Sequence, residues 1–270
     1  EFQACAAAGQ ISLMNSYYDA FRKTNLEAAQ ILLTRDDFKD RERYLNIRNC
    51  IYSLLDHGVL PIINENDTVA VDELKFGDND MLAGYVTMGL KADILVILTS
   101  VEGLHREAQA KGEVVSDVRE ITPDIEQLVY DERTPMGTGG MASKITTAKM
   151  VTAAGEPVLL ADGRQEGILA DIFRGENVGT LFHAAGKKIP GRKRWLAFSA
   201  KPCGSIIVDA GAACALRDRG TSLLPAGALK VTGRFASGEL VAVRDEKKKI
   251  IAKGLVNYSS EEITLIAGKH

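Results

Sequence analysis

Helical periodicity and unbroken apolar runs alternate along the first 175 residues of the chain. Apolar positions at spacings of three and four, or apolar stretches between predicted strands and loops, predict helices at 1–23, 40–56, 81–90, 141–154 and 166–174. Continuous apolar runs predict buried strands, at 28–34, 58–64, 92–100 and 156–163. Apolar strands that alternate with helices are typical of a parallel sheet covered on both faces. We therefore expect an α/β fold with a mostly parallel sheet and helices on both of its faces.

The pattern changes near residue 185. The stretch 183–195 holds few apolar side chains and five Lys or Arg, with a Pro and two Gly, which is typical of a linker rather than a nucleic-acid site. Beyond it, short strands recur every eight to twelve residues, which predicts a small β-rich barrel or sandwich of about seventy residues. We expect a first domain at 1–185, a linker at 186–196 and a second domain at 197–270.

Composition and charge narrow the class of protein. The chain is 46% hydrophobic and 26% charged, as in globular proteins, and its net charge of −3 argues against a nucleic-acid footprint over the whole chain. The four cysteines have no CxxC spacing, which favours reduced thiols over a disulfide framework or a zinc site. No apolar run reaches the length of a membrane span and no signal peptide is visible, so we expect a cytoplasmic protein.

Two polar clusters flank the junction between the second predicted strand and the next helix. They are NEND at 64–67 and GDND at 77–80. Taken one at a time, these residues would be interpreted as turn and helix-cap residues. Ligands of parallel α/β sheets bind beyond the carboxyl ends of strands, however, and amides together with carboxylates can hold a zwitterion. The density of the two clusters favours a site for an amino group, a metal or a phosphate.

A glycine-rich loop, PMGTGGMASK at 135–144, precedes the helix that carries Lys144. Glycines let backbone N–H groups approach phosphate oxygens closely, and a lysine adds a positive charge for the transferred group. The loop does not match the GxxxxGK[ST] pattern, and a flexible connector would have a similar composition. Together with the polar clusters in an α/β domain, the loop favours phosphoryl transfer.

INEND (63–67), GDND (77–80), GTGGMASK (137–144) and GTLFHA (179–184), in this order, resemble the glutamate 5-kinase family. The stretch LLTRDDFKDRERYLNIRN at 32–49 is similar to the segment that precedes NEND in that family. The resemblance implies an amino acid kinase fold for the first domain and a PUA-like domain for the tail. It also implies transfer of the γ-phosphoryl group of ATP to the side-chain carboxylate of L-glutamate, with Mg²⁺, as the first step of proline synthesis.

The resemblance also implies roles for individual residues. Asn64, Asp67 and Asn79 would contact L-glutamate, and Asp80 would orient catalytic lysines. Lys144 would stabilise charge on the transferred phosphoryl group. The ATP-binding residues would be Thr99 and Ser100, which end the third predicted strand, and a run that ends at the lysine: Thr138, Gly139, Gly140, Met141, Ala142, Ser143 and Lys144. No residue is implied as a metal ligand.

The family begins with a strand that leads into a Lys- and Gly-rich turn, and a Ser-Gly-Ala segment follows it. Neither is found in the sequence, so we expect the chain to lack the family's amino-terminal segment and to release no ADP with glutamate by itself. The loop at 105–112 and Ser100 also depart from the family pattern.

The expected partners are L-glutamate and ATP, with proline as a feedback inhibitor and a second copy of the chain in a homo-oligomer. A related kinase that acts on aspartate, acetylglutamate or carbamate is one alternative. A non-catalytic RNA-binding or regulatory protein that retains the kinase scaffold and the PUA-like module is the other.

Overall fold

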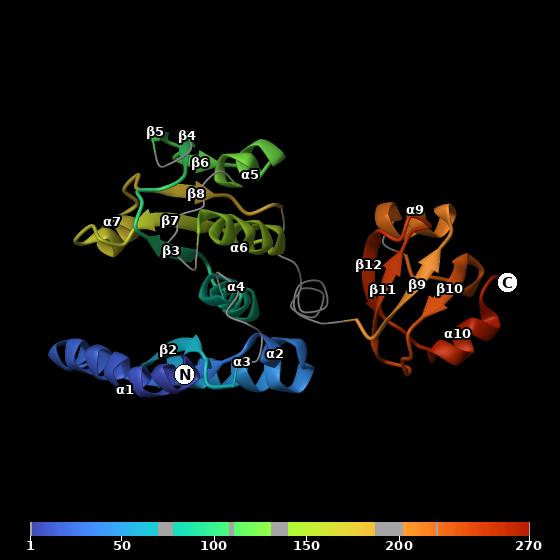
Figure 1. Cartoon of the computed structure of the whole chain (residues 1–270), viewed down its shortest axis with the longest axis horizontal. Coiled ribbons are helices and arrows are strands. Elements are labelled where there is room, and N and C mark those ends of the chain that lie inside the picture. The colour runs from blue at the N-terminus through green and yellow to red at the C-terminus, as the bar shows by residue number, and fades with distance from the viewer. Residues whose placement is uncertain are drawn as a thin grey trace. The chain divides into compact units, whose positions relative to one another are not determined.

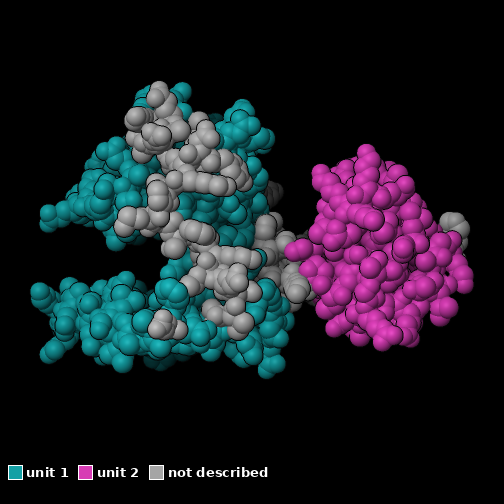
Figure 2. Space-filling model, viewed as in Figure 1, with its two compact units in different colours: residues 1–194 teal, residues 195–270 magenta. Residues whose placement is uncertain are grey.

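The computed structural model describes residues 2–69, 78–107, 111–130, 140–186, 202–219 and 221–269. The chain divides into two compact units, residues 1–194 and 195–270 (Figure 2). Most of the predicted linker lies outside the described residues. Within the described part, none of the helices has the length and apolarity that a membrane crossing requires.

The first unit alternates helices and strands along most of its length. Its first half contains α1 (Phe2–Phe21), a 3-10 turn (Arg22–Thr24), β1 (Glu27–Leu33), α2 (Arg35–Lys39), α3 (Arg41–Asp56), β2 (Val59–Glu65) and α4 (Asp78–Leu90). Its second half contains β3 (Leu95–Thr99), β4 (His105–Glu107), β5 (Lys111–Val114), β6 (Asp117–Val118), α5 (Pro123–Tyr130), α6 (Met141–Ala154), β7 (Val158–Asp162), α7 (Ile168–Arg174) and β8 (Thr180–Phe182).

The predicted α/β class is confirmed, because β1 pairs with β2 and β3 pairs with β7 in parallel. The described strands do not form the one sheet that we expected. They form a β1-β2 pair, a sheet in the order β3-β7-β8-β6, and a β4-β5 hairpin. β8 runs antiparallel to β7. The chain reverses just before β8 at Gly179, whose φ is +70° and whose Cβ, if present, would lie 2.0 Å from the carbonyl oxygen of Leu160.

Helix α4 lies between the two sheets of the first unit (Figure 1). It contacts β2 and α3 on one side and β3 and α6 on the other. Aromatic packing holds α4 against α2, because the rings of Tyr85 and of Phe38 from α2 stack with centroids 5.4 Å apart. Both side chains are buried. α4 therefore carries Asn79 and Asp80, in its first turn, between the end of β2 and α6.

The described part of the second unit contains the four predicted strands, together with two helices that the sequence pattern did not predict. Its elements are β9 (Gly204–Val208), α9 (Ala210–Arg219), a 3-10 turn (Pro225–Gly227), β10 (Ala228–Thr232), β11 (Leu240–Arg244), β12 (Ile250–Leu255) and α10 (Ser260–Ile266). The strands form one sheet in the order β10-β9-β11-β12, so the described residues show an open sheet and not the closed barrel or sandwich that we expected.

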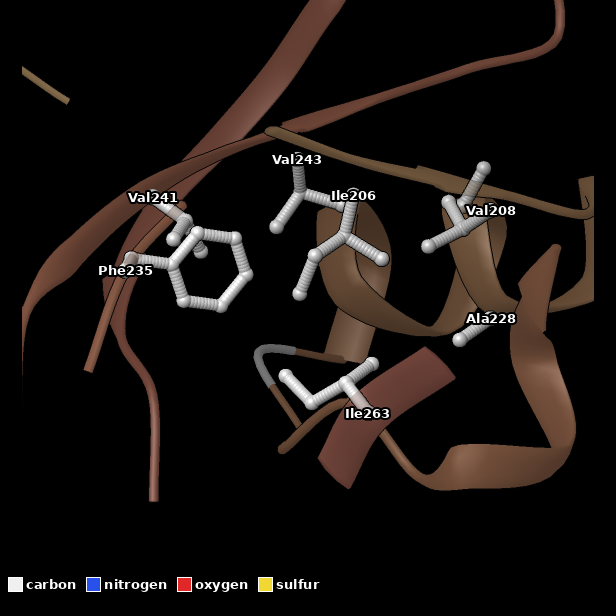
Figure 3. Close-up of a cluster of buried hydrophobic side chains, with 8 residues drawn as sticks. Ile206, Val208, Ala228, Phe235, Val241, Val243 and Ile263 are labelled. Atoms are coloured by element: carbon white, nitrogen blue, oxygen red, sulfur yellow. The ribbon is translucent and has the colours of Figure 1, made fainter. Parts of the chain in front are cut away.

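A single apolar cluster forms the core of the second unit. Side chains from β9 and β11 meet Ile263 of α10 and Phe235 (Figure 3). The members of the cluster are Ile206, Val208, Ala213, Ala228, Phe235, Val241, Val243 and Ile263, and each is less than 10% exposed. Helix α10 begins with a capping box, in which Ser259 and Glu262 satisfy each other's backbone N–H groups. The second unit therefore has a core of its own.

Candidate active site

A chain of side-chain amides links three elements at the end of β2. Asn64 lies one residue before the end of β2, where its register partner in β1 is Leu32. The Nδ2 group of Asn79, in the first turn of α4, donates to Asn64 Oδ1 over 3.1 Å. Asn64 Nδ2 in turn donates to Oε1 of Gln10 on α1 over 3.0 Å. The two asparagines that the family resemblance assigned to one ligand are therefore in contact.

An ion pair joins α4 to α6 next to these amides. Lys144 Nζ lies 2.9 Å from Asp80 Oδ2, and the hydroxyl of Ser143 donates to the same oxygen over 3.1 Å. The Lys144 and Asp80 side chains are 12% and 17% exposed. A charge pair that is mostly shielded from water has a stronger field than one on the surface, so it can act on charge that develops nearby. The expected proximity of Asp80 and Lys144 is confirmed.

The close approach of α4 and α6 depends on Gly84. A Cβ at this position would lie 2.7 Å from Met150 Cε and 3.0 Å from Thr147 Cγ2, both on α6. Gly84 lies one helical turn beyond Asp80, and Thr147 lies about one turn beyond Lys144. The absence of a side chain at Gly84 therefore lets α4 and α6 pack closely enough for Asp80 and Lys144 to form their ion pair.

Replacing Gly84 by valine is expected to lower the free energy of unfolding by roughly 1–3 kcal/mol, because the side chain would overpack the α4–α6 contact. Activity should fall as well, because α4 carries Asp80. Urea denaturation measures the first effect. Gly9→Val is the matched control, since Gly9 lies within α1 with no atom within 4 Å of its Cβ position. Equal stability of the two variants would contradict the proposed role of Gly84.

Of the glycine-rich loop at 135–144, the structure describes residues 140–144, which lie at the start of α6. Gly140 is the N-cap residue of α6, with φ −63° and ψ 169°. Met141, Ala142 and Ser143 form the first turn, followed by Lys144. The first N–H groups of a helix lack intrahelical partners and favour anions, so this end can bind phosphate oxygens beside the lysine. Thr138 and Gly139 lie outside the described residues.

Thr99 and Ser100 lie at the carboxyl end of β3, next to the end of β7. Thr99 is the register partner of Asp162, and its carbonyl accepts from Gly163 N over 2.8 Å. Arg164 donates to both carboxylate oxygens of Asp162, over 2.9 and 2.8 Å, and these bonds lower the pKa of Asp162 to about 2. Within the described residues, neither Thr99 nor Ser100 bonds to the Asp80–Lys144 pair.

Asp67 lies in the turn after β2 and lines a pocket of about 440 Å³ between α1, β1 and this turn. Its side chain is half-buried, and it makes no hydrogen bond or ion pair with another residue in the described ranges. Gln10 lines the same pocket, and its Nε2 is buried with no hydrogen-bond partner among the described residues.

Of the predicted site residues, the structure brings two sets into direct contact: Asn64 with Asn79, and Asp80 with Lys144 and Ser143. It does not join Asp67, Thr99 or Ser100 to either set by a hydrogen bond within the described part. Sequence reasoning missed Gln10. The signal was a polar residue on an apolar helix face, three positions after Ala7 and four before the buried Met14.

Two family models match the chain. The amino acid kinase family matches residues 1–162, and the PUA domain matches residues 204–270. The first range contains the site residues from Gln10 to Asp162, including the Asp80–Lys144 pair, and the second covers the described sheet and helices of the second unit.

Curated relatives match over nearly the whole chain. A glutamate 5-kinase of Trichlorobacter lovleyi is 46% identical over 269 residues, which is 98% of this chain and 72% of the relative. A glutamate 5-kinase of Carboxydothermus hydrogenoformans is 46% identical over 273 residues, which is 100% of this chain and 73% of the relative. Among solved structures, UMP kinase from Bacillus anthracis is similar with a TM-score of 0.40 and 14% identity, over 61% of each chain.

Proposed function

Because the chain belongs to the glutamate 5-kinases of the amino acid kinase family, we propose that Asp80 and Lys144 form its phosphoryl-transfer centre. The reaction is the phosphorylation of L-glutamate in proline biosynthesis. The single observation that supports this site is the shielded ion pair between α4 and α6, at the end of α6 that follows the glycine-rich loop. ATP is the phosphoryl donor in this proposal, and Thr99, Ser100 and the residues 138–144 bind it.

The chemistry needs positioning and charge stabilisation more than proton transfer. The side-chain carboxylate of glutamate is already a nucleophile at neutral pH, so one of its oxygens attacks the γ-phosphorus without a general base. A bond forms between the carboxylate oxygen and the γ-phosphorus, and the bond between the γ-phosphorus and the oxygen that bridges it to the β-phosphorus breaks. ADP leaves with the electron pair of the broken bond. Lys144 and the first N–H groups of α6 stabilise the oxygens of the transferred group, while Asp80 holds the lysine in place.

Mg²⁺ is part of the proposal as a companion of the nucleotide. It is usually bound through substrate phosphates and water, with one or two carboxylates, rather than by a cage of protein ligands. Among the described residues there is no group of three or more His, Cys, Asp or Glu that could hold a metal ion. The ion would neutralise charge on the phosphates, and no residue of the chain is assigned as its dedicated ligand.

Asn64, Asp67 and Asn79 bind the glutamate in this proposal. The Asp67 carboxylate takes the ammonium group, and the linked amides of Asn64 and Asn79 lie between Asp67's pocket and Asp80. Asn79 immediately precedes Asp80 on α4, so a substrate held by the amides would present its far carboxylate to the phosphoryl-transfer centre.

The proposal extends to the surroundings of the enzyme. It includes a location in the cytoplasm, where ATP and glutamate are available, assembly into a homo-oligomer and feedback inhibition by proline. The alternative of a non-catalytic RNA-binding or regulatory protein gains no support from the relatives, which are named as kinases. RNA contact through the second unit stays a prediction.

ADP release in a coupled assay tests the proposed function. The full product of the gene is incubated with ATP, Mg²⁺ and one acceptor at a time: L-glutamate, L-aspartate, N-acetylglutamate, carbamate or UMP. Glutamate should support release far above the rate without an acceptor. Faster ADP release with any other acceptor than with glutamate would overturn the substrate assignment. If ADP were released at the same rate with glutamate and without any acceptor, the protein would only hydrolyse ATP.

A further inference from the structure

We infer that Gln10 on α1 binds the α-carboxylate of the amino-acid substrate and so helps to select a zwitterion. The inference deepens the proposed function and rests on its assignment of the glutamate site. In the series of hydrogen-bonded amides Asn79–Asn64–Gln10, Gln10 is at the end away from Asp80. Three observations carry it: an unpartnered buried donor, the direction of the amide chain, and the charge of the adjoining pocket.

The first observation is the donor itself. Gln10 Nε2 is inaccessible to solvent and has no hydrogen-bond partner among the described residues. Leaving a buried amide donor unpaired destabilises a protein, and most such groups in proteins are paired. An acceptor brought by a ligand would remove that cost when it binds, so the unpaired donor is available to a ligand oxygen.

The second observation is the direction of the hydrogen bonds. Asn79 donates to Asn64, and Asn64 donates to Gln10. Each carbonyl oxygen is thus matched to the preceding NH₂ group, and the donor left over at the α1 end is Gln10 Nε2. A substrate oxygen at that end would extend the series. At its other end, the series reaches the residue next to Asp80, which is the side on which the reacting carboxylate must lie.

The third observation is the pocket that Gln10 shares with Asp67. Its volume of about 440 Å³ is in the range of small-molecule sites. Among the described residues that line it are the acids Glu65 and Asp67 but no Lys or Arg. A ligand ammonium therefore finds its partner in a carboxylate, whereas a ligand carboxylate must rely on neutral donors such as Gln10 Nε2. Ile11, Met14 and Leu32 supply apolar wall for the methylene groups.

Calorimetric binding of two ligands to two proteins tests the inference. The ligands are L-glutamate and its α-amide, in which NH₂ replaces one α-carboxylate oxygen. The proteins are the full gene product and its Gln10→Glu variant. The new carboxylate retains an acceptor for Asn64 Nδ2 but replaces the Nε2 donor by an oxygen. The variant should bind glutamate roughly 10- to 100-fold more weakly, because a hydrogen bond to a charged group becomes a repulsion.

The α-amide should lose much less affinity in the variant, because its NH₂ group can donate to the new carboxylate. The wild-type protein should also bind glutamate more tightly than the α-amide. Gln3→Glu is the matched control: Gln3 lies on the same helix but is exposed and outside the pocket lining, so the same charge change there should alter the Kd for glutamate by about twofold or less.

Equal losses for the two ligands in Gln10→Glu would show that Gln10 only shapes the site and would overturn the inference. An unchanged Kd for glutamate, or equal binding of both ligands by the wild-type protein, would also overturn it. Since binding is measured without turnover, a protein that binds glutamate as expected but releases no ADP would refute the proposed function and leave the role of Gln10 intact.

Discussion

Replacing Lys144 by methionine is expected to lower kcat for glutamate phosphorylation by roughly 100-fold or more, the size of effect seen when one preorganised charge-stabilising group is removed. The lysine is 12% exposed and pairs with Asp80 at the start of α6, so its charge acts with little screening by water. The KM for glutamate should change much less, since the lysine is proposed to act on the transferred group. Steady-state kinetics of the full gene product measure both quantities.

Lys149→Met is the matched control for this prediction. Lys149 lies on the same helix, is 58% exposed and pairs with Glu126. The control loses the same charge at the surface, so it should retain a kcat close to that of the wild type. Thermal unfolding of both variants separates a folding defect from a catalytic one. A Lys144→Met variant that is folded and keeps the wild-type kcat would refute the assigned role.

Replacing Asp67 by asparagine is expected to raise the KM for glutamate by roughly 100-fold, because it leaves the substrate ammonium without its charged partner. The KM for ATP should stay close to its wild-type value, since Asp67 lines the pocket beside α1 and lies outside the start of α6. Asp19→Asn, which removes an exposed carboxylate of α1, should leave both values unchanged. Equal effects of Asp67→Asn on the two substrates would contradict the assignment.

Glutarate separates the role of Asp67 from a general loss of structure. It has both carboxylates of glutamate but no amino group. If Asp67 acts on the ammonium, the Asp67→Asn substitution should weaken the use of glutamate and leave the poor use of glutarate unchanged or improved. A loss of the same size for both acceptors would mean that Asp67 supports the pocket without touching the amino group.

Local patterns predicted the longer elements of the first unit, because burial on both faces leaves a clear apolar signal, but they missed α5 and the short strands β4, β5, β6 and β8. β1, β2 and α6 begin and end within one residue of the expected limits. Helix α9 was missed, since its sequence AGAACALRDR is rich in small residues that are also common in turns. The division of the described strands of the first unit into separate sheets was also missed, because an apolar run predicts a buried strand and does not identify the strand beside it.

The candidate site was predicted less by local pattern than by resemblance. Asp80 and Lys144 are 64 positions apart, and no periodicity could have paired them. The pairing requires the tight α4–α6 contact at Gly84, which is a property of the packed structure. Gln10 was missed for a different reason. A single amide within an apolar helix belongs to no motif. Gln10 is identified as a candidate site residue only by its unpaired Nε2 atom in the folded chain.

The central claim is that the chain's site joins a phosphoryl group to the side-chain carboxylate of glutamate. Isotope transfer tests it most directly. The full gene product is given ATP, Mg²⁺ and glutamate labelled with ¹⁸O in its side-chain carboxylate, and the acyl phosphate is trapped with hydroxylamine. Hydroxylamine attacks the carbonyl carbon, so the bridging oxygen leaves with the phosphate. The account predicts inorganic phosphate that carries one ¹⁸O from glutamate, together with the hydroxamate. Phosphate without the label, released at the same rate as ADP, would contradict it.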